Sequence, residues 1–183
     1  MNRAKFCVQA MTIKKAFKEE GIYKTFEKVA NLGYSCIELS QVPMDEESIQ
    51  IMGKAAREFK IEIPAISANL ESVNDSEQES LMKNFNELLL KCKKLNAAYI
   101  RMGVMPYPYL ASEKRLLEFC KKCEEMAQRL KEHDIDLYYH NHHVEFQKLN
   151  GQYVLDILKS NTPHMGFELD VHWIWRGGEN PVE

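Results

Sequence analysis

The sequence of 183 residues has no run of about 18 apolar residues, the length that a membrane-spanning helix needs. Its first ten residues also lack the apolar stretch of a secretion signal. There is no excess of positive charge, because 24 Lys and Arg stand against 27 Asp and Glu, and so no overall positive field attracts a phosphate backbone. We therefore expect a cytoplasmic protein with neither a membrane nor a nucleic acid as partner.

The low numbers of Gly, Pro and Cys exclude further classes of protein. Only 8 Gly and 6 Pro occur, and 45% hydrophobic with 28% charged residues is the composition of a folded domain, which excludes collagen-like repeats and disorder. The five cysteines are an odd number spread through apparent core segments, so we expect reduced thiols and no disulfide framework. Cys120 and Cys123 form a C-x-x-C inside a helical pattern, where buried cysteines act as small hydrophobes.

Short β-rich runs alternate with amphipathic stretches along the whole chain. The predicted strands are Phe6 to Gln9, Cys36 to Leu39, Ile61 to Ser67, Tyr99 to Met102, Asp136 to His140 and Met165 to Asp170. Five helical patterns lie between them, and the clearest has apolar residues at three-and-four spacing from Leu81 to Leu95. Strand alternating with helix predicts a parallel α/β sheet built through crossover connections.

Successive strands start about 30 residues apart, the size of one βα unit, so the chain holds about six units. Six strands suit an open doubly wound sheet or three-quarters of an eight-stranded (β/α) TIM barrel of about 250 residues. The final residues, 177–183, place Asn180 as a helix cap and Pro181 at the first helical position, which is the start of a further helix. We therefore expect residues 1–183 to form a single, incomplete barrel domain, cut within a larger repeat.

Reactive side chains gather at the end of the fifth predicted strand, in residues 138–146. Three of the six His residues lie here within four positions. Alternation along a strand places His140 and His142 on one side and Asn141 and His143 on the other.

A second group, residues 168–178, follows the sixth strand. Asp170 ends an apolar strand, so a cation or donor is expected beside it, and Trp173 could form the wall of a sugar pocket. Sequential strands of a βα repeat are usually neighbours, so the two groups could share one site. Their carboxylate oxygens and imidazole nitrogens suit a divalent ion such as Mn, Co, Mg or Zn, which could polarise a carbonyl and hydroxyl pair.

These motifs resemble a known family. The resemblance rests on Tyr139-His140-Asn141-His142, Glu145-Phe146, Leu169-Asp170 with Trp173, Gly178-x-x-Pro181, and Leu32-Gly33-Tyr34 leading to Ile37-Glu38-Leu39. Together they are similar to the xylose isomerase-like TIM barrels, specifically the sugar phosphate isomerase/epimerase group.

The resemblance implies one divalent metal held by residues from strands five to eight, with carboxylates as bases. It assigns the strand-six ligand to Asp170 and the strand-five ligand and base to Glu145, with His140 or His142 as alternative ligands. It further implies that His140, His142 and Trp173 contact the substrate, and Glu38 is a further candidate. The ligands of strands seven and eight have no counterpart in this sequence, so we expect low metal occupancy.

The predicted function is isomerisation or epimerisation of a keto-sugar or polyol by proton transfer next to a carbonyl. Three alternatives remain open: a dehydratase or lyase of the same barrel family, a non-catalytic remnant or binding module, and an endonuclease that shares the barrel. The first and sixth strands are left with open edges, so the sequence also predicts homo-oligomers formed through exposed sheet edges.

Overall fold

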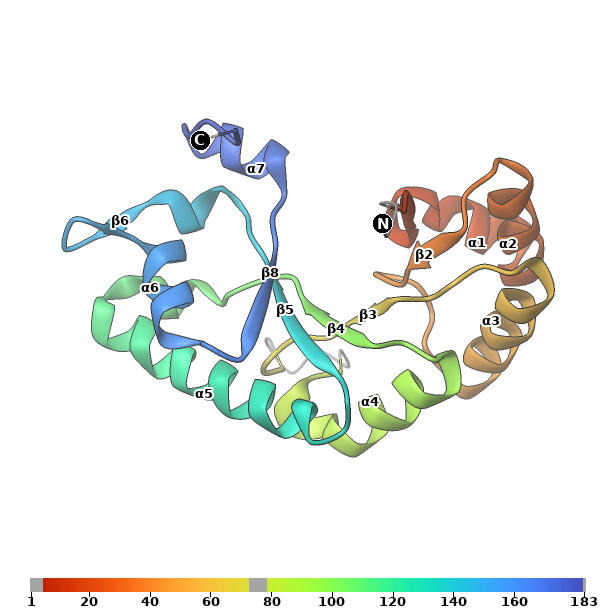
Figure 1. The fold of residues 1–183 in the computed structure, drawn as a ribbon, viewed down its shortest axis with the longest axis horizontal. Helices are drawn as coiled ribbons and strands as arrows, with labels where there is room; N and C mark the ends of the chain where they lie inside the picture. Colours follow the sequence, from red (N-terminus) through yellow and green to blue (C-terminus); the bar gives the residue numbers. More distant parts are fainter. Residues whose placement is uncertain (1–4, 73–78, 183) are drawn as a thin grey trace. The chain divides into compact units, whose positions relative to one another are not determined.

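The computed structural model describes residues 5–72 and 79–182. The chain divides into two compact units: unit 1 comprises Met1–Ser67 with Asn86–Tyr99, and unit 2 comprises Ala68–Phe85 with Ile100–Glu183. Strands and helices alternate in both units (Figure 1). None of the described helices combines the length and apolar character that a bilayer crossing requires.

Unit 1 is built on short parallel strands. Its elements are β1 (Cys7–Gln9), η1 (Ala10–Ile13), α1 (Lys14–Glu20), α2 (Ile22–Asn31), β2 (Cys36–Glu38), α3 (Glu46–Phe59) and β3 (Ala65–Ser67), with the greater part of α4 (Leu81–Leu95). Strands β1 and β2 pair in parallel, with Gln9 opposite Glu38, and a bridge between Leu39 and Ile66 joins β2 to β3. The sheet is therefore parallel, as the alternating pattern predicts.

The helices of unit 1 form where local signals and burial agree. Helix α3 begins at Asp45, whose side chain accepts a hydrogen bond from the Ser48 backbone nitrogen at 3.0 Å and so caps the first turn. Helices α2 and α3 pack against each other and bury Phe26, Ile49 and Met52. Burial of these apolar faces supplies most of the stability of such helices.

Unit 2 contains the site described below. Its elements are β4 (Tyr99–Met102), η2 (Tyr107–Ala111), α5 (Glu113–Lys131), β5 (Asp136–His140), η3 (His143–Phe146), β6 (Lys148–Leu149), β7 (Gln152–Tyr153), α6 (Val154–Asn161), β8 (Met165–Glu168) and α7 (Val171–Arg176). Strand β5 lies between β4 and β8. The pairing of β5 with β8 is parallel and sets His140 opposite Glu168, so the predicted fifth and sixth strands are confirmed as neighbours.

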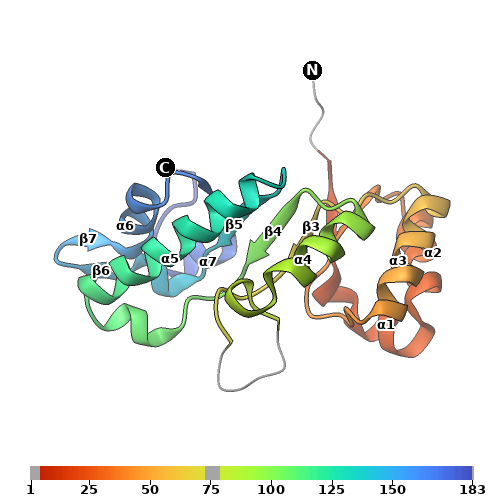
Figure 2. The same ribbon diagram turned by 90° about the horizontal axis from the view of Figure 1, so that it is seen from below.

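Helix α5 covers one face of this sheet and packs beside α6 (Figures 1 and 2). Its buried side chains follow the predicted helical spacing: Leu116, Phe119, Cys120, Cys123, Met126, Ala127 and Leu130. Tyr139 points to the same face, where its ring meets those of Phe119 and Phe167 edge-on, each at 6.4 Å between centroids. Because side chains alternate along a strand, His140 and Tyr138 project to the opposite face.

A glycine maintains the space on that opposite face. A Cβ atom added to Gly166 would lie 2.6 Å from the ring of Tyr138, its partner in the β5–β8 register. Any larger residue at position 166 would therefore displace the Tyr138 ring or the strand. Gly166 therefore leaves room for the Tyr138 ring to lie close to the β8 backbone.

Several elements differ from the sequence prediction. The predicted strand from Ile61 to Ser67 is shortened to β3, because Pro64 has no backbone N–H to donate to a ladder. The predicted sixth strand ends at Glu168, because Asp170 caps helix α7. Helix α1 and the β6–β7 hairpin were not predicted, since their few residues carry too short a periodic pattern.

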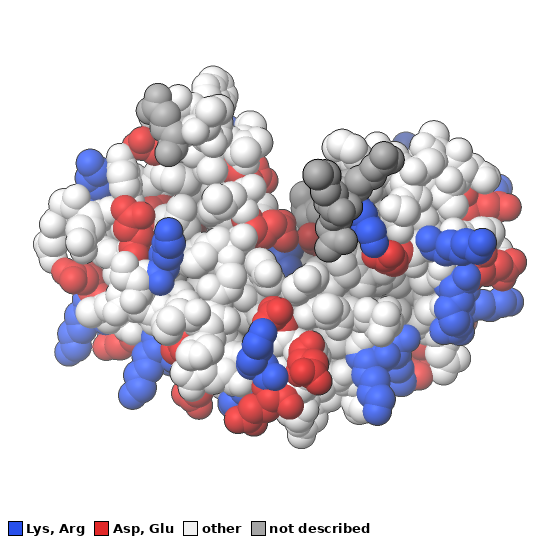
Figure 3. All heavy atoms as spheres, in the orientation of Figure 1, with Lys and Arg blue, Asp and Glu red and all other residues white. Residues whose placement is uncertain are grey.

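Positive and negative side chains are interspersed over the face seen in Figure 3. On that face the described Lys and Arg residues alternate with Asp and Glu, in line with the nearly balanced composition.

Candidate functional site

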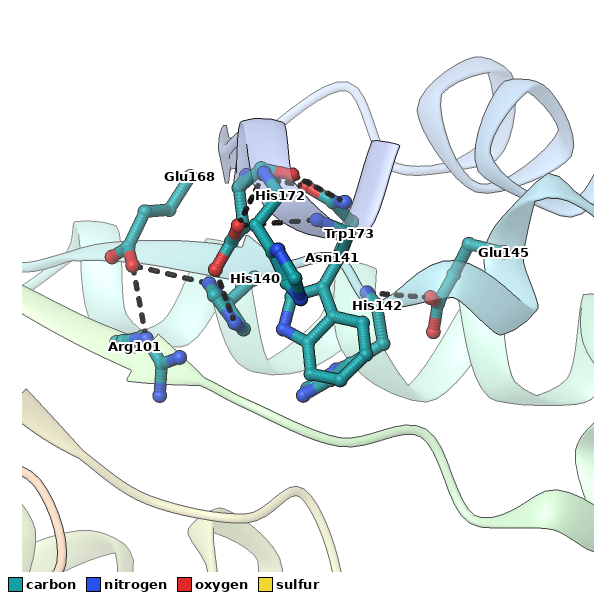
Figure 4. A network of polar contacts seen from close by, with 9 residues as sticks. Arg101, His140, Asn141, His142, Glu145, Glu168, His172 and Trp173 are labelled. Atoms are coloured by element: carbon teal, nitrogen blue, oxygen red, sulfur yellow. Dashed lines mark hydrogen bonds and ion pairs between the residues drawn. The ribbon is translucent and has the colours of Figure 1, made fainter. Parts of the chain in front are cut away.

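Four side chains, here called the polar site, meet at the carboxyl ends of three adjacent strands of unit 2 (Figure 4). Arg101 comes from β4 and His140 from β5. Glu168 is the last residue of β8, and Asp170 lies two residues after it. Parallel strands bring their carboxyl ends to the same edge, so residues far apart in sequence are placed together.

The imidazole of His140 lies between the two carboxylates of the polar site. Its Nδ1 is 3.2 Å from Glu168 Oε1, and its Nε2 is 3.7 Å from Asp170 Oδ2. The first contact has ion-pair distance without the alignment of a hydrogen bond, and His140 is only 7% exposed. A single ring therefore connects two acids across its two nitrogens.

Arg101 holds Glu168 from the other side. Its Nε donates a hydrogen bond to Glu168 Oε1 at 3.1 Å, and the arginine is itself buried. Burial acts to raise the pKa of Glu168, but the contacts with His140 and Arg101 outweigh it, and the pKa of that carboxyl is lowered from 4.5. Glu168 is consequently a carboxylate near neutral pH, with its side chain still 37% exposed.

Asp170 has two tasks. Its Oδ1 accepts hydrogen bonds from the backbone nitrogens of His172 at 2.9 Å and Trp173 at 3.3 Å, which caps helix α7. Its backbone is fixed to fully buried Asn141, whose Oδ1 accepts from the Asp170 nitrogen at 2.8 Å. These contacts leave Oδ2 directed toward His140.

An aromatic and imidazole group borders the polar site. The His142 ring lies 4.9 Å from that of His140 and 5.1 Å from that of Trp173, and His143 stacks on Trp173 at 5.4 Å. Burial, followed by the neighbouring His140, lowers the pKa of His142 below 6.5. His142 is therefore mostly neutral at pH 7, and its ring can both donate and accept a hydrogen bond.

Glu145 contacts the backbone of this group at His142 and is 1% exposed. Its Oε1 accepts from the Tyr139 hydroxyl at 2.5 Å and its Oε2 accepts from the His142 backbone nitrogen at 2.7 Å. Burial and this carboxylate raise the pKa of Tyr139 well above 10, so the phenol remains a donor. Both oxygens of Glu145 are thus used in fixing the turn that carries His142.

The structure brings together His140, His142, Asp170 and Trp173, four of the residues predicted for the site. Glu145 adjoins them but faces inward, and its role as ligand and base stays a prediction. Glu38 ends β2 in unit 1.

Sequence reasoning did not name Arg101, and it gave no role to Asn141 or Glu168, which lie within the two groups of reactive residues. A signal existed for Arg101, since a cation inside the apolar strand Tyr99–Met102 requires a buried partner. The partner of Arg101 is Glu168 at the end of β8. The sequence alone does not show which of the acidic residues pairs with Arg101.

The polar site does not by itself fit a divalent metal. Across residues 5–72 and 79–182, no group of three or more His, Cys, Asp and Glu side chains is arranged to hold an ion. One oxygen of each acid is also hydrogen-bonded already, Asp170 Oδ1 to the first turn of helix α7 and Glu168 Oε1 to Arg101.

Comparison with known sequences gives one family. The family described as "Xylose isomerase-like TIM barrel" matches residues 26–183, which is most of the chain. None of the curated proteins compared with the chain matches it.

Solved structures share the fold. A sugar phosphate isomerase/epimerase from Parabacteroides distasonis ATCC 8503 aligns with TM-score 0.77 and 18% identity, over 100% of this chain and 70% of its own. The probable 3-DHS dehydratase AsbF from Bacillus anthracis aligns with TM-score 0.70 and 16% identity, over 98% and 67%. A xylose isomerase-like TIM barrel protein from Mycobacterium smegmatis, in complex with magnesium, aligns with TM-score 0.51 and 14% identity, over 81% and 55%. At these identities the likeness establishes a partial (β/α) barrel.

Proposed function

This chain belongs to the xylose isomerase-like TIM barrel family, and from that premise we propose that unit 2 carries a proton-transfer site of the sugar isomerase/epimerase type. Its substrate would be a small keto-sugar or a related polyol, and the reaction would move a proton at the carbon next to the carbonyl. The fold relatives named as a sugar phosphate isomerase/epimerase and a dehydratase support a hydroxy-carbonyl substrate class.

One observation carries the proposal: the His140 ring lies between the carboxylates of Glu168 and Asp170. Isomerisation takes a proton from one carbon and returns one to the neighbouring carbon, whereas epimerisation returns it to the other face of the same carbon. Two groups that exchange roles as acid and base can serve either reaction. Glu168 and Asp170 are 37% and 30% exposed, whereas His140 is buried between them. In this proposal the two acids face the substrate and His140 passes the proton between them.

Arg101 would keep Glu168 in its basic form. Its guanidinium bonds the carboxylate and, with His140, lowers the pKa of Glu168. The same fixed positive charge, buried where water does not screen it, would stabilise negative charge that develops on the substrate oxygen. His142 and Trp173 would border the substrate, and Glu145 would position His142 through its backbone. Glu38 remains a proposed substrate contact.

The expected divalent ion of Mn, Co, Mg or Zn has no step in this proposal. Magnesium is present in the complex from Mycobacterium smegmatis, but the described donors of this chain do not form a three-ligand group. The assignment of Asp170 and Glu145 as ligands therefore stays a prediction.

The test is solvent exchange on candidate substrates. Ketopentoses and ketohexoses, free and phosphorylated, are incubated with the chain in D₂O, and proton NMR follows loss of the signal at the carbon next to the carbonyl. We expect exchange with at least one sugar, and a rate lower by about 100-fold or more in Glu168→Gln and in Asp170→Asn. Glu132→Gln, an exposed carboxyl on the surface, is the matched control.

Unchanged exchange in both site variants would contradict the assignment. Loss of water from the sugar without exchange would favour the dehydratase alternative. Binding of sugars with no chemical change would favour a binding module.

A further inference from the structure

A second row of polar side chains lies in unit 1. Gln9, Glu38 and Ser67 are at or next to the carboxyl ends of β1, β2 and β3. Gln9 is opposite Glu38 in the parallel register, so their side chains share a face. Leu39 pairs with Ile66, and residues adjacent to a paired couple face the other way, so Glu38 and Ser67 also share that face.

The two faces of this small sheet differ in character. Ile37, Leu39 and Ile66 on one face are 0%, 1% and 0% exposed and form apolar core. The other face presents an amide, a carboxylate and a hydroxyl in adjacent positions at the strand ends. Three polar side chains at adjacent strand ends therefore distinguish this face from the apolar one.

Two atoms of the row are buried without a partner. Gln9 Oε1 and Ser67 Oγ are inaccessible to solvent and have no hydrogen-bond partner among the described residues. Buried polar groups are almost always paired, because an unpaired one loses its bonds to water and gains nothing in return. An unpaired buried polar atom therefore calls for an explanation, such as a bound molecule that completes the bonding or a role in function.

We propose that Gln9, Glu38 and Ser67 form a binding site for adjacent hydroxyl groups of a neutral polyhydroxy compound. An amide and a hydroxyl both donate and accept, and a carboxylate accepts, which matches the two-way bonding of vicinal hydroxyls. A divalent cation is usually bound by several oxygen ligands that include more than one carboxylate, whereas only one residue of this row is an acid. The choice of a polyhydroxy ligand rests on the proposed function, but the site itself requires only unit 1.

The two unpartnered atoms give the site a distinctive signature. Removing a buried hydroxyl that has no partner should not destabilise the protein, although it removes a bond to the ligand. Ser67→Ala should therefore keep or raise the melting temperature while weakening binding. A hydroxyl with a purely structural role would show the reverse.

The experiment titrates xylitol, which has hydroxyl groups but no carbonyl and so cannot undergo the proposed reaction. Binding to the full chain is measured by calorimetry or saturation-transfer NMR, and melting is followed for each variant. We expect xylitol to bind, and Ser67→Ala and Gln9→Met each to weaken it by about fivefold, the value of one neutral hydrogen bond. Ser160→Ala, which removes an exposed hydroxyl of α6, is the control and should bind as the unaltered chain does.

Equal xylitol affinity in the unaltered chain, Ser67→Ala and Gln9→Met would overturn the proposal, as would a chain that binds no xylitol. A titration with magnesium chloride alone that depends on Ser67 and Gln9, while xylitol does not, would overturn it in favour of a cation site. Failure of deuterium exchange with keto-sugars concerns the residues of unit 2 and would contradict the proposed function, not this site.

Discussion

Arg101, His140 and Glu168 owe their arrangement to burial. Arg101 and His140 are each 7% exposed, and a polar side chain buried to that extent is stable only with a partner. Glu168 serves both of them through Oε1. The carboxylate of Glu168 is therefore held by Arg101 and His140, while 37% of its side chain stays exposed to solvent.

Glu168 should make stability depend on acid pH. Its pKa is lower in the folded state than the ordinary 4.5, so its ionisation stabilises the fold above that value and the contribution is lost as the pH falls through the lowered pKa. We expect the difference in melting temperature between the unaltered chain and Glu168→Gln to shrink as the pH falls below about 4.5. Scanning calorimetry across this range measures it. A difference that is constant with pH would show that the charge of Glu168 is not held by Arg101 and His140.

At the scale of single residues, the sequence indicated which side chains lie together where a motif was dense, and it did not indicate partners that are distant along the chain. His140, His142 and Trp173 lie within a few residues of turn and strand signals, and they meet in the structure. Arg101 and Glu168 are 67 residues apart, and only the order of strands brings them together.

Asp170 both caps helix α7 and belongs to the polar site. The helix has only six residues, too few to be stable without a cap, and Asp170 supplies two hydrogen bonds to its first turn. The same cap fixes the direction of Oδ2. Sequence periodicity predicted the long amphipathic helices, whereas it read Asp170 as the end of a strand, because six residues do not establish a helical period.

Asp170 variants should separate these two tasks. Asn is as good a cap as Asp, whereas Ala is not, so Asp170→Ala should lose about 1 kcal/mol of unfolding free energy and Asp170→Asn much less. That corresponds to a melting temperature lower by about 2 to 4 °C for Asp170→Ala. Both variants should lose deuterium exchange on the keto-sugar. Equal stability losses in the two variants, measured by urea unfolding, would contradict the capping role.

The chain as a whole keeps an unpaired sheet edge in unit 2. Strand β8 pairs with β5 on one side, and none of the other described strands pairs with its second edge. Leu169, Val171 and Trp175, just beyond it, are 57%, 61% and 70% exposed. An unprotected edge with apolar neighbours is a template for association.

We therefore expect this chain to associate at increasing concentration, with β8 and α7 at the contact. Size-exclusion chromatography with light scattering measures it, and Trp175→Lys should reduce association by adding charge beside the edge. A monomer at all concentrations that unfolds cooperatively would contradict the expectation.

The most direct test of the proposed site is a double-mutant cycle on deuterium exchange, with Glu168→Gln, His140→Gln and the two combined. If His140 connects Glu168 to Asp170, the residues act as one unit, and each single variant should slow exchange by about 100-fold while the double variant is little slower than either. Losses that multiply, to about 10,000-fold in the double variant, would show that Glu168 and His140 act separately and would contradict the account.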